Sequence, residues 1–493
     1  MVTRRAVLGG LMGSVAGAAL ANAPLTSVRP QPRSSEVVRR SARAVDDLMA
    51  EARLSGKIGF AVADARTGEV LEAKNPVLPL PPASVTKAIT ALYALDRLGP
   101  GYRFRTRLVA DGVLANGRLK GDLILVGGGD PTLDTDALGE MARQLKAAGL
   151  REITGRFKVH SRALPTIPSI DPDQPAHVGY NPTISGLNLN YNRVHFEWKR
   201  QAGGYALKMD ARARKYSPQV AIARMTVVNR RLPVYTYADK GGADQWTVAK
   251  PALGKAGSRW LPVRKPQMYA AEVFQTLARS HGIVLPRAEV ARGAANGTVL
   301  VARTSAPLRD ILRDMLKWST NLTAEVVGLS ASAAGGKAPT SLKASAAAMT
   351  RWAKGELGVN KAKFVDHSGL GGASRMSAAD MVKALVRVRR AGLLPPILKD
   401  IPMRNAKGEV LPNHPVKIKA KTGTLNYVSA LAGYMSAQGG RELAFAIFTA
   451  DLDRRAQIDR AADEVPEGTR AWKSASRRLQ LRLIERWGAA HTG

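Results

Sequence analysis

The chain has 493 residues, of which 74 are Lys or Arg and 39 are Asp or Glu, so its formal net charge is +35. Hydrophobic residues make up 45% and charged residues 23% of the sequence, a composition that excludes wholesale disorder and a fibrous repeat. At roughly 150 residues per domain, this length predicts about three domains. No cysteine is present, which excludes disulfides, thiolate metal sites and lipid attachment at a cysteine.

The amino terminus carries a targeting pattern. Arg4 and Arg5 precede an uncharged run rich in Ala, Gly and Leu at residues 6–21, which predicts a twin-arginine export signal. A small-x-small motif before Asn22 predicts cleavage there, so we expect a signal at residues 1–21 and a location in the periplasm or cell envelope. A permanent membrane anchor needs about 20 strongly apolar residues. Glycines and a serine interrupt this run, which makes an anchor the weaker alternative.

The excess of positive charge creates a field that attracts polyanions. The basic residues are scattered along the chain and aromatic residues are only 5% of it, so we expect no nucleic-acid partner. An exported protein meets other polyanions, including peptidoglycan carboxylates and lipid head groups. An anionic cell-envelope surface is therefore the expected partner, and a solvated basic exterior is the alternative.

The two ends of the chain together predict an α+β fold. Apolar residues at helical spacing predict amphipathic helices over 37–54 and 470–487. Period-two alternation and turn residues predict five strands. These strands are Lys57–Ala63, Glu69–Ala73, Val416–Lys421, Val428–Met435 and Leu443–Ala450. Strands from both ends with helices beside them predict one antiparallel five-stranded sheet covered by helices.

The middle of the chain differs in character and predicts an insertion. From about Gly101 to Asn296, strand-like pieces alternate with many Gly and Pro residues and clustered basic residues. The part from Pro165 to Gly242 is more irregular still. We expect an outer domain at 36–100 and 297–493, an inserted domain at 101–164 and 243–296, and a nested module at 165–242.

Ser84 and Lys87 form the first candidate motif. They lie three residues apart at the start of an expected helix that runs to Leu98 and ends at Gly99, so they share one helix face. A serine hydroxyl needs an adjacent base at neutral pH, and a lysine can serve if burial or a neighbouring cation lowers its pKa. Taken alone, the pair also fits a helix cap followed by a surface lysine.

Ser319 and Asn321 form the second candidate motif. They lie between an expected helix capped by Ser305 and a new helical run that begins near Thr323. At such a break both side chains can point into one cleft, where the hydroxyl can relay a proton and the amide can hold a substrate backbone. A polar interhelical turn is the alternative.

Lys421, Thr422, Gly423 and Thr424 form the third candidate motif, at the end of an alternating strand. A cation, hydroxyls and a glycine along a strand edge suit an extended peptide that adds as a further strand and presents its terminal carboxylate. An exposed edge strand without a ligand is the alternative.

In this order and on these elements, the three motifs resemble Ser-x-x-Lys, Ser-x-Asn and Lys-Thr-Gly of the penicillin-binding and serine β-lactamase superfamily. The wide gap between the first two resembles the class C low-molecular-mass penicillin-binding proteins, the D-alanyl-D-alanine carboxypeptidase/endopeptidase family, which carry a large insertion there. Three more segments, at 121–133, 184–190 and 366–370, resemble that family. One residue departs, because the family more often has glycine at His367.

The resemblance implies a serine carboxypeptidase that cuts peptidoglycan stem peptides ending in D-alanyl-D-alanine and is acylated by β-lactam antibiotics. It implies that Ser84 is the acylated nucleophile and Lys87 its general base. Ser319 and Asn321 would be the proton relay and the substrate clamp. The terminal carboxylate would bind the third motif, Lys421, Thr422, Gly423 and Thr424.

Further expectations concern the same site. The amides of Ser84 and Thr424 would form the oxyanion hole. Lys421 would also keep Lys87 neutral through like-charge repulsion. No cofactor is implied, and the spacing of the histidines predicts no metal site. Two other functions compete: a β-lactamase, because Glu356 and Asn360 have the spacing of a deacylating loop, and a non-catalytic peptidoglycan-binding protein.

Overall fold

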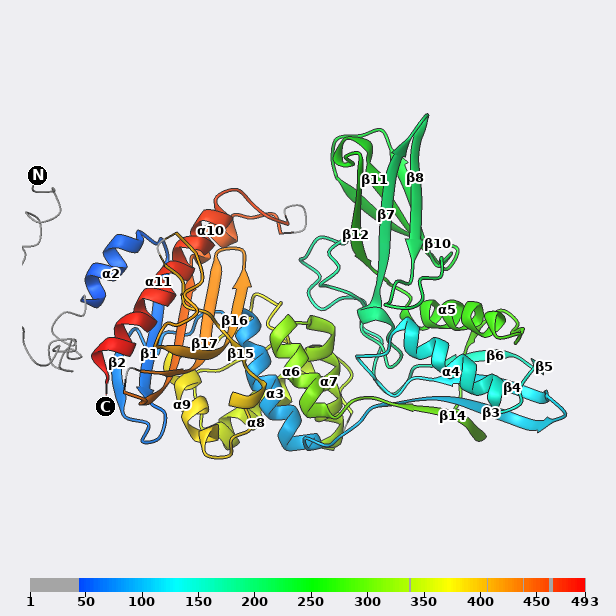
Figure 1. The fold of residues 1–493 in the computed structure, drawn as a ribbon, viewed down its shortest axis with the longest axis horizontal. Helices are drawn as coiled ribbons and strands as arrows, with labels where there is room; N and C mark the ends of the chain where they lie inside the picture. Colours follow the sequence, from blue (N-terminus) through cyan, green and yellow to red (C-terminus); the bar gives the residue numbers. More distant parts are fainter. Residues whose placement is uncertain (1–43, 337, 406, 438, 461–463, 493) are drawn as a thin grey trace, which may run out of the picture. The chain divides into compact units, whose positions relative to one another are not determined.

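The computed structural model describes residues 44–492 except 337, 406, 438 and 461–463 (Figure 1). The expected export signal at 1–21 and the first part of the helix expected over 37–54 lie outside the described residues. The remainder of that helix is α2 (Val45–Ala52). None of the described helices combines the length and the apolar character required to span a membrane.

Strands from both ends of the chain form one antiparallel sheet, as predicted. Its order is β15-β16-β17-β18-β1-β2. The strands are β1 (Lys57–Asp64), β2 (Val70–Lys74), β15 (Lys399–Asp400), β16 (Lys417–Leu425), β17 (Val428–Ser436) and β18 (Glu442–Ala450). The first strand pairs with the last, Lys57 opposite Ala450. The two-residue edge strand β15 adds a sixth member to the five predicted strands.

Helices cover both faces of this sheet (Figure 1). The C-terminal helix α11 (Thr469–Ala490) packs with α2 on one face, where Trp487 lies 5.6 Å from the ring of Phe60. On the other face a larger apolar core joins the sheet to five helices. These are α3 (Thr86–Leu98), α6 (Leu308–Trp318), α7 (Asn321–Ala334), α8 (Leu342–Leu357) and α9 (Ala378–Arg389).

Two helix starts differ from the sequence-based expectation. Pro307, not Ser305, is the N-cap of α6, and α7 begins at Asn321 instead of near Thr323. The Ser305 hydroxyl instead accepts the backbone N–H of Phe104 at 3.0 Å. It therefore joins the chain segment that leaves α3 to the segment that returns to α6.

The insertion contains a second six-stranded sheet. It is ordered β13-β6-β4-β3-β14, with β5 paired to β4. Its strands are β3 (Arg105–Ala115), β4 (Arg118–Val126), β5 (Glu152–Ile153), β6 (Phe157–His160), β13 (Glu289–Val290) and β14 (Thr298–Thr304). Helices α4 (Thr135–Ala147) and α5 (Pro266–Ser280) share an apolar core with one face of this sheet.

Two three-stranded sheets complete the insertion. Their orders are β12-β7-β8 and β10-β11-β9. The strands are β7 (Arg193–Gln201), β8 (Gly204–Asp210), β9 (Ala223–Val228), β10 (Tyr235–Lys240), β11 (Ala243–Ala249) and β12 (Ala256–Pro262). They run on both sides of the expected boundary at residue 242, and their buried residues belong to the same apolar core as α4 and α5.

Helix α3 lies in the centre of the first core. Every residue from Thr86 to Leu95 is buried, Lys87 included. Its neighbour α7 carries Gly328, where an added Cβ would lie only 2.1 Å from Cγ of His367. The imidazole thus occupies the space that a side chain at position 328 would need.

This packing predicts that Gly328→Ala lowers the free energy of unfolding by about 3 kcal/mol, because either the helix or a buried ring must shift. Urea denaturation measures the change. Gly335→Ala, at the exposed end of the same helix, is the control and is expected to have little effect. The double variant Gly328→Ala/His367→Gly, which removes the ring, is expected to recover part of the loss; no recovery would contradict this account.

Candidate active site

Ser84 lies in a short 3-10 turn, Ala83–Val85, that leads directly into α3. The turn is backbone-strained, since Ala83 has a φ of 46°. Gly369 packs on it so closely that an added Cβ would lie 1.9 Å from the carbonyl oxygen of Ala83. The loop that contains Gly369 therefore supports the turn that carries Ser84.

The Lys87 amine is fully buried and faces Ser84, one helical turn away, as predicted. Its Nζ lies 3.0 Å from Oγ of Ser84, 2.7 Å from Oδ1 of Asn321 and 2.8 Å from the carbonyl oxygen of Ser368. Three acceptors match the three donors of an ammonium group. The amine is therefore held in one position, in contact with the serine hydroxyl.

Burial lowers the pKa of Lys87 from its usual 10.5 to about 8, because a charged ammonium is disfavoured away from water. The negative charges of Glu325 and Asp366 oppose this effect. Both carboxylates are buried, and both accept backbone N–H groups of the loop that contains Ser368. Glu325 accepts the N–H groups of His367 and Ser368. They fix the loop that in turn fixes the lysine.

The second and third motifs meet at Lys421. Its Nζ donates to Oγ of Ser319 at 3.1 Å and to the carbonyl oxygen of Thr422 at 2.6 Å. Ser319 ends α6 with a left-handed φ of 59°, and Asn321 begins α7, so both lie at the predicted interhelical break. The Asn321 amide also donates to the carbonyl oxygen of Tyr180 in the insertion. The structure thus brings together all three motifs.

The pKa of Lys421 lies well below its usual value, first because of burial and then because of the positive charge of Lys87. We expected Lys421 to lower the pKa of Lys87 by repulsion. The structure brings the two cations close enough to repel each other, as the positive charge of Lys87 acts on Lys421. Burial is nevertheless the largest cause that lowers the pKa of Lys87.

Gly423 allows β16 to approach the nucleophile turn. An added Cβ would lie 2.6 Å from the carbonyl oxygen of Pro82 and 3.0 Å from the amide nitrogen of Ser84. Any larger residue would push the strand away from Ser84. The next residue, Thr424, lines the same pocket as Ser84.

His367, which departs from the family pattern, packs behind the active site and does not line it. Its ring is fully buried, and Nε2 lies 2.7 Å from Oγ of Ser345. Burial lowers its pKa to about 3, so the ring is neutral at physiological pH. The imidazole packs behind the 366–369 loop, while the backbone of that loop contacts Lys87.

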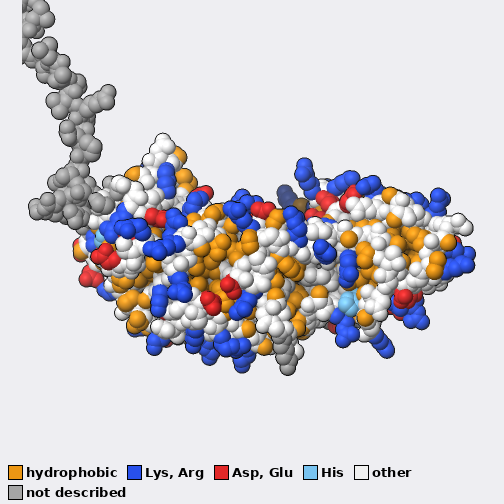
Figure 2. Space-filling view, turned by 90° about the horizontal axis from the view of Figure 1, so that it is seen from below, with side chains coloured by type: hydrophobic (Ala, Val, Ile, Leu, Met, Phe, Trp, Pro, Cys, Tyr) orange, Lys and Arg blue, Asp and Glu red, His pale blue; other side chains and the backbone are white. Residues whose placement is uncertain are grey.

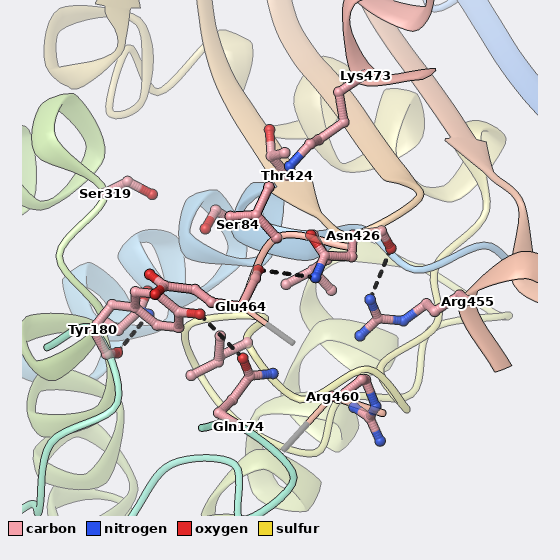
Figure 3. A pocket seen from close by; sticks show the side chains of 14 residues that line it. Ser84, Gln174, Tyr180, Ser319, Thr424, Asn426, Arg455, Arg460, Glu464 and Lys473 are labelled. Carbon is pink, nitrogen blue, oxygen red and sulfur yellow. Dashed lines mark hydrogen bonds between the residues drawn. The ribbon is translucent and has the colours of Figure 1, made fainter. Parts of the chain in front are cut away.

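The three motifs open into a pocket of about 300 Å³ (Figure 3). Ser84, Ser319, Asn321 and Thr424 form part of its wall. Sequence reasoning missed the residues of the opposite wall, which come from the insertion, from the turn between β16 and β17, and from the chain after β18. They include Gln174, Tyr180, Asn426, Arg455, Arg460, Glu464 and Lys473. These residues follow no motif, so no sequence signal linked them to Ser84.

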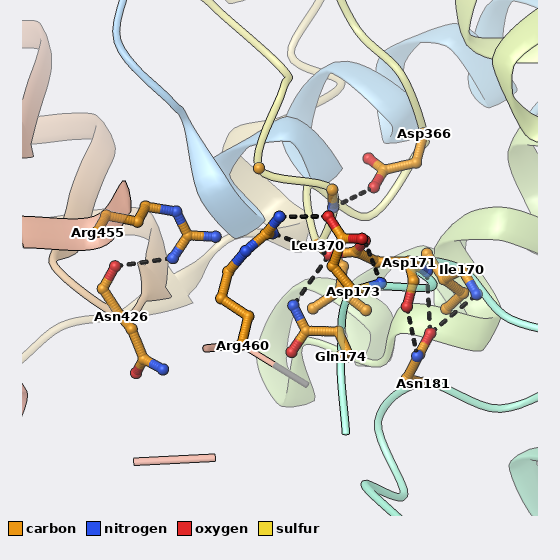
Figure 4. A network of polar contacts seen from close by, with 12 residues as sticks. Ile170, Asp171, Asp173, Gln174, Asn181, Asp366, Leu370, Asn426, Arg455 and Arg460 are labelled. Carbon is orange, nitrogen blue, oxygen red and sulfur yellow. Dashed lines mark hydrogen bonds and ion pairs between the residues drawn. The ribbon is translucent and has the colours of Figure 1, made fainter. Parts of the chain in front are cut away.

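Charged contacts fix this opposite wall. Glu464 accepts from Arg259 at 2.7 Å, lies 3.3 Å from Nε2 of His177, and has a pKa lowered to about 2 by these two partners. Arg460 pairs with Asp171 and Asp173 (Figure 4). Residues of the insertion thereby hold the segment after β18 at the pocket.

Two other features lie outside this site, one a candidate from the sequence and one found in the structure. Glu356 is exposed in the last turn of α8, which ends at the left-handed Gly358, and it does not line the pocket. Among the described residues, one group has metal-ligand spacing, His195, Glu197 and Asp210. Arg212 already pairs with both carboxylates, at 2.8 and 2.9 Å.

Comparisons with known proteins agree with this geometry. The family model of D-Ala-D-Ala carboxypeptidase 3 (S13) matches residues 41–465. A D-alanyl-D-alanine carboxypeptidase of Actinomadura sp. (strain R39) is 28% identical over 447 residues, which cover 82% of this chain and 79% of that protein. The D-alanyl-D-alanine carboxypeptidase DacB of Haemophilus influenzae is 25% identical over 446 residues, covering 83% and 90%.

A solved structure shares the fold. Penicillin binding protein 4 (dacB) from Haemophilus influenzae superposes with a TM-score of 0.70 at 21% identity, over 90% of this chain and 99% of that chain. The same protein complexed with a novel β-lactam gives a TM-score of 0.68. These matches confirm the predicted α+β fold and the resemblance to class C penicillin-binding proteins. The chain belongs to the D-Ala-D-Ala carboxypeptidase 3 (S13) family of serine peptidases.

Proposed function

We propose that this D-alanyl-D-alanine carboxypeptidase cleaves peptidoglycan stem peptides through an acyl-enzyme at Ser84, with Lys87 as general base. One observation carries the proposal: the buried Lys87 amine, with a pKa of about 8, lies 3.0 Å from the Ser84 hydroxyl. A base of this pKa is partly neutral near physiological pH, whereas an ordinary lysine is almost wholly protonated. The names of the family and of both curated relatives support the substrate class.

The proposed mechanism begins when neutral Lys87 takes the proton of Ser84. Oγ of Ser84 then attacks the carbonyl carbon between the two D-alanines. The amides of Ser84 and Thr424 bind the developing oxyanion, an interaction worth about 3 to 4 kcal/mol per donor. As the C–N bond of the substrate breaks, Ser319 relays to the leaving amine the proton that Lys87 took, and water then hydrolyses the ester and frees Ser84.

Substrate binding completes the proposal. An extended peptide would add to the edge of β16 beside Ser84, with its terminal carboxylate at Lys421, Thr422 and Thr424. Asn321 would clamp its backbone. Gly423 would leave the strand close enough to Ser84 for attack. Endopeptidase action, in which the group that follows the D-alanine belongs to a second stem peptide, is the alternative; digestion of purified peptidoglycan and identification of the products decides between them.

We also propose that the protein is exported through the twin-arginine route and acts in the periplasm or cell envelope. Arg4 and Arg5, followed by the weakly apolar run at 6–21, support this location. The anionic envelope surface remains the proposed partner of its net charge of +35.

Penicillin is expected to form one covalent adduct, on Ser84. Intact-protein mass spectrometry followed by peptide mapping measures it. Ser84→Ala is expected to form none, because the hydroxyl that opens the β-lactam ring is absent. An adduct of equal yield on the Ser84→Ala variant would disprove the proposed nucleophile, and rapid release of the adduct would favour the β-lactamase alternative.

The rate of acylation should depend on pH through Lys87. Only its neutral form accepts a proton, so the rate should rise with pH up to about 8 and fall roughly tenfold per unit below that value. Stopped-flow measurement of penicillin acylation gives this profile. A profile that stays flat down to pH values far below the pKa would rule out Lys87 as the base.

Lys421→Gln separates binding of the carboxylate from control of the base. It should lower kcat/KM for D-alanyl-D-alanine peptides by roughly 10² or more, since a charge-assisted contact is lost. The acidic limb of acylation should move little from pH 8, because burial is the largest cause that lowers the pKa of Lys87. A large upward shift of the limb would show that repulsion from Lys421, and not burial, is the main cause of the low pKa of Lys87.

Glu464→Gln tests the ion pairs of the opposite pocket wall. The variant keeps the size of the side chain but loses the charge that binds Arg259 and His177. KM for stem peptides should rise roughly 3- to 10-fold while kcat changes little, because the catalytic groups are not touched. Glu442→Gln removes a similarly exposed ion-paired carboxylate that does not line the pocket. Equal effects of both variants would contradict a role in binding.

A further inference from the structure

Three arginines follow one another at the start of β3, two on the face of the inserted sheet that α4 and α5 leave open and one just before the strand. Between Arg103 and Arg107 exposure alternates, since Phe104 and Thr106 are buried and the arginines are not. Successive side chains of a strand point to opposite faces, so Arg105 and Arg107 of β3 share one face at an interval of about 7 Å. Arg103 lies two residues before the strand and continues the same alternation of exposure.

These arginines line a groove of about 600 Å³, together with Tyr102, Gly128 and Thr304. We call it the arginine groove. It lies where the chain leaves α3 for β3 and returns along β14. At its wall the backbone approaches closely, because an added Cβ at Gly128 would lie 2.2 Å from the carbonyl oxygen of Arg105. None of its lining residues contributes to the pocket at Ser84.

The charges in the arginine groove are not compensated. Within the part of the chain that the structure describes, Arg105 and Arg107 form no ion pair, whereas Arg303 pairs with Asp130 and Arg156 with Glu289. Among the described residues, Arg103 donates only to the carbonyl oxygen of Ser305, at 2.7 Å.

Positive charge also crowds beside the groove. His160 lies in register with Val126, which is paired with Arg107 on the next strand. Its pKa is lowered first by burial and then by the charges of Arg162 and Arg107. Like charges gathered on one sheet face destabilise the fold, so an anion that binds there gains affinity from the relief of repulsion. In Figure 2 Lys and Arg side chains are widespread on the visible surface, with few Asp and Glu between them.

We propose that the arginine groove binds a carboxylate-bearing stretch of peptidoglycan, at a second site apart from Ser84. The inference rests on the proposed function, which makes this polymer the substrate. The guanidinium fork matches a carboxylate with two hydrogen bonds, and a row of three forks, two of them on β3, matches a linear polymer with repeated carboxylates. A concave site favours such a polymer over a flat lipid surface. Binding at the groove would keep the enzyme on the polymer between cuts and raise the local concentration of stem peptides.

Binding can be measured without catalysis by co-sedimentation of Ser84→Ala protein with purified peptidoglycan sacculi. Adding Arg105→Gln/Arg107→Gln should weaken binding on the order of tenfold, because two carboxylate contacts are lost. Arg103 is left in place because it bonds to Ser305. The matched control, Lys199→Gln/Lys240→Gln, removes the same charge from exposed residues of β7 and β10 and should change binding by less than about twofold.

Two further measurements separate this site from the active site. With Ser84 intact, Arg105→Gln/Arg107→Gln should keep penicillin acylation and kcat/KM for a short D-alanyl-D-alanine peptide, but digest sacculi more slowly. Failure of Ser84 to acylate would overturn the proposed function and leave the binding result standing. Equal loss of binding in the control variant would overturn the proposal for the arginine groove, since net charge alone would then explain binding to the sacculi.

Two binding measurements test which kind of ligand the groove takes. Sacculi whose carboxylates have been amidated should bind the parent and the Arg105→Gln/Arg107→Gln variant equally weakly. Vesicles of phosphatidylglycerol and phosphatidylcholine should bind both proteins alike. A loss of vesicle binding without a loss of sacculus binding would overturn the proposal in favour of a lipid surface.

Discussion

The burial of one amine beside one hydroxyl is the constraint on which the site depends. Charged lysines are almost never fully buried without partners, because removal from water disfavours the ammonium form. Within the described part of the chain, Lys87 is buried without an ion pair, and its amine contacts oxygen acceptors from Ser84, Asn321 and Ser368. The fold thus holds this lysine where its neutral form is accessible, and that property is what the proposed chemistry requires.

Much of the surrounding structure can be understood as support for that amine. Glu325 and Asp366 use their carboxylates to hold the backbone of the 366–369 loop, which presents the Ser368 carbonyl. Gly328 leaves room for the neutral His367 ring behind the loop. The two carboxylates also raise the pKa of Lys87 against the effect of burial. The same groups that fix the lysine in place therefore limit how far its pKa can fall.

The sequence was sufficient for the parts of the molecule that depend on local pattern. Strand alternation and the 84/87 spacing predicted the main sheet and the shared helix face, because period and spacing decide these features directly. The prediction that Ser305 caps α6 was wrong because its hydroxyl accepts a hydrogen bond from the backbone N–H of Phe104, some two hundred positions away in the chain. The opposite pocket wall could not be predicted, since Glu464, Arg259 and His177 meet only through tertiary contacts. The boundaries of the inserted parts stay a prediction.

The insertion affects the site through charge as well as through shape. Its acidic residues Asp171 and Asp173 pair with Arg460 of the segment after β18, and its Arg259 and His177 contact Glu464 of the same segment. Opposite charges are thus matched at the pocket, where position matters. On the open face of the inserted sheet, Arg105 and Arg107 are left unmatched within the described chain. A chain with a net charge of +35 has few carboxylates to distribute. The carboxylates at the pocket wall pair with cations and hold that wall in place. The arginine groove has few carboxylates, so its positive charge can attract anions.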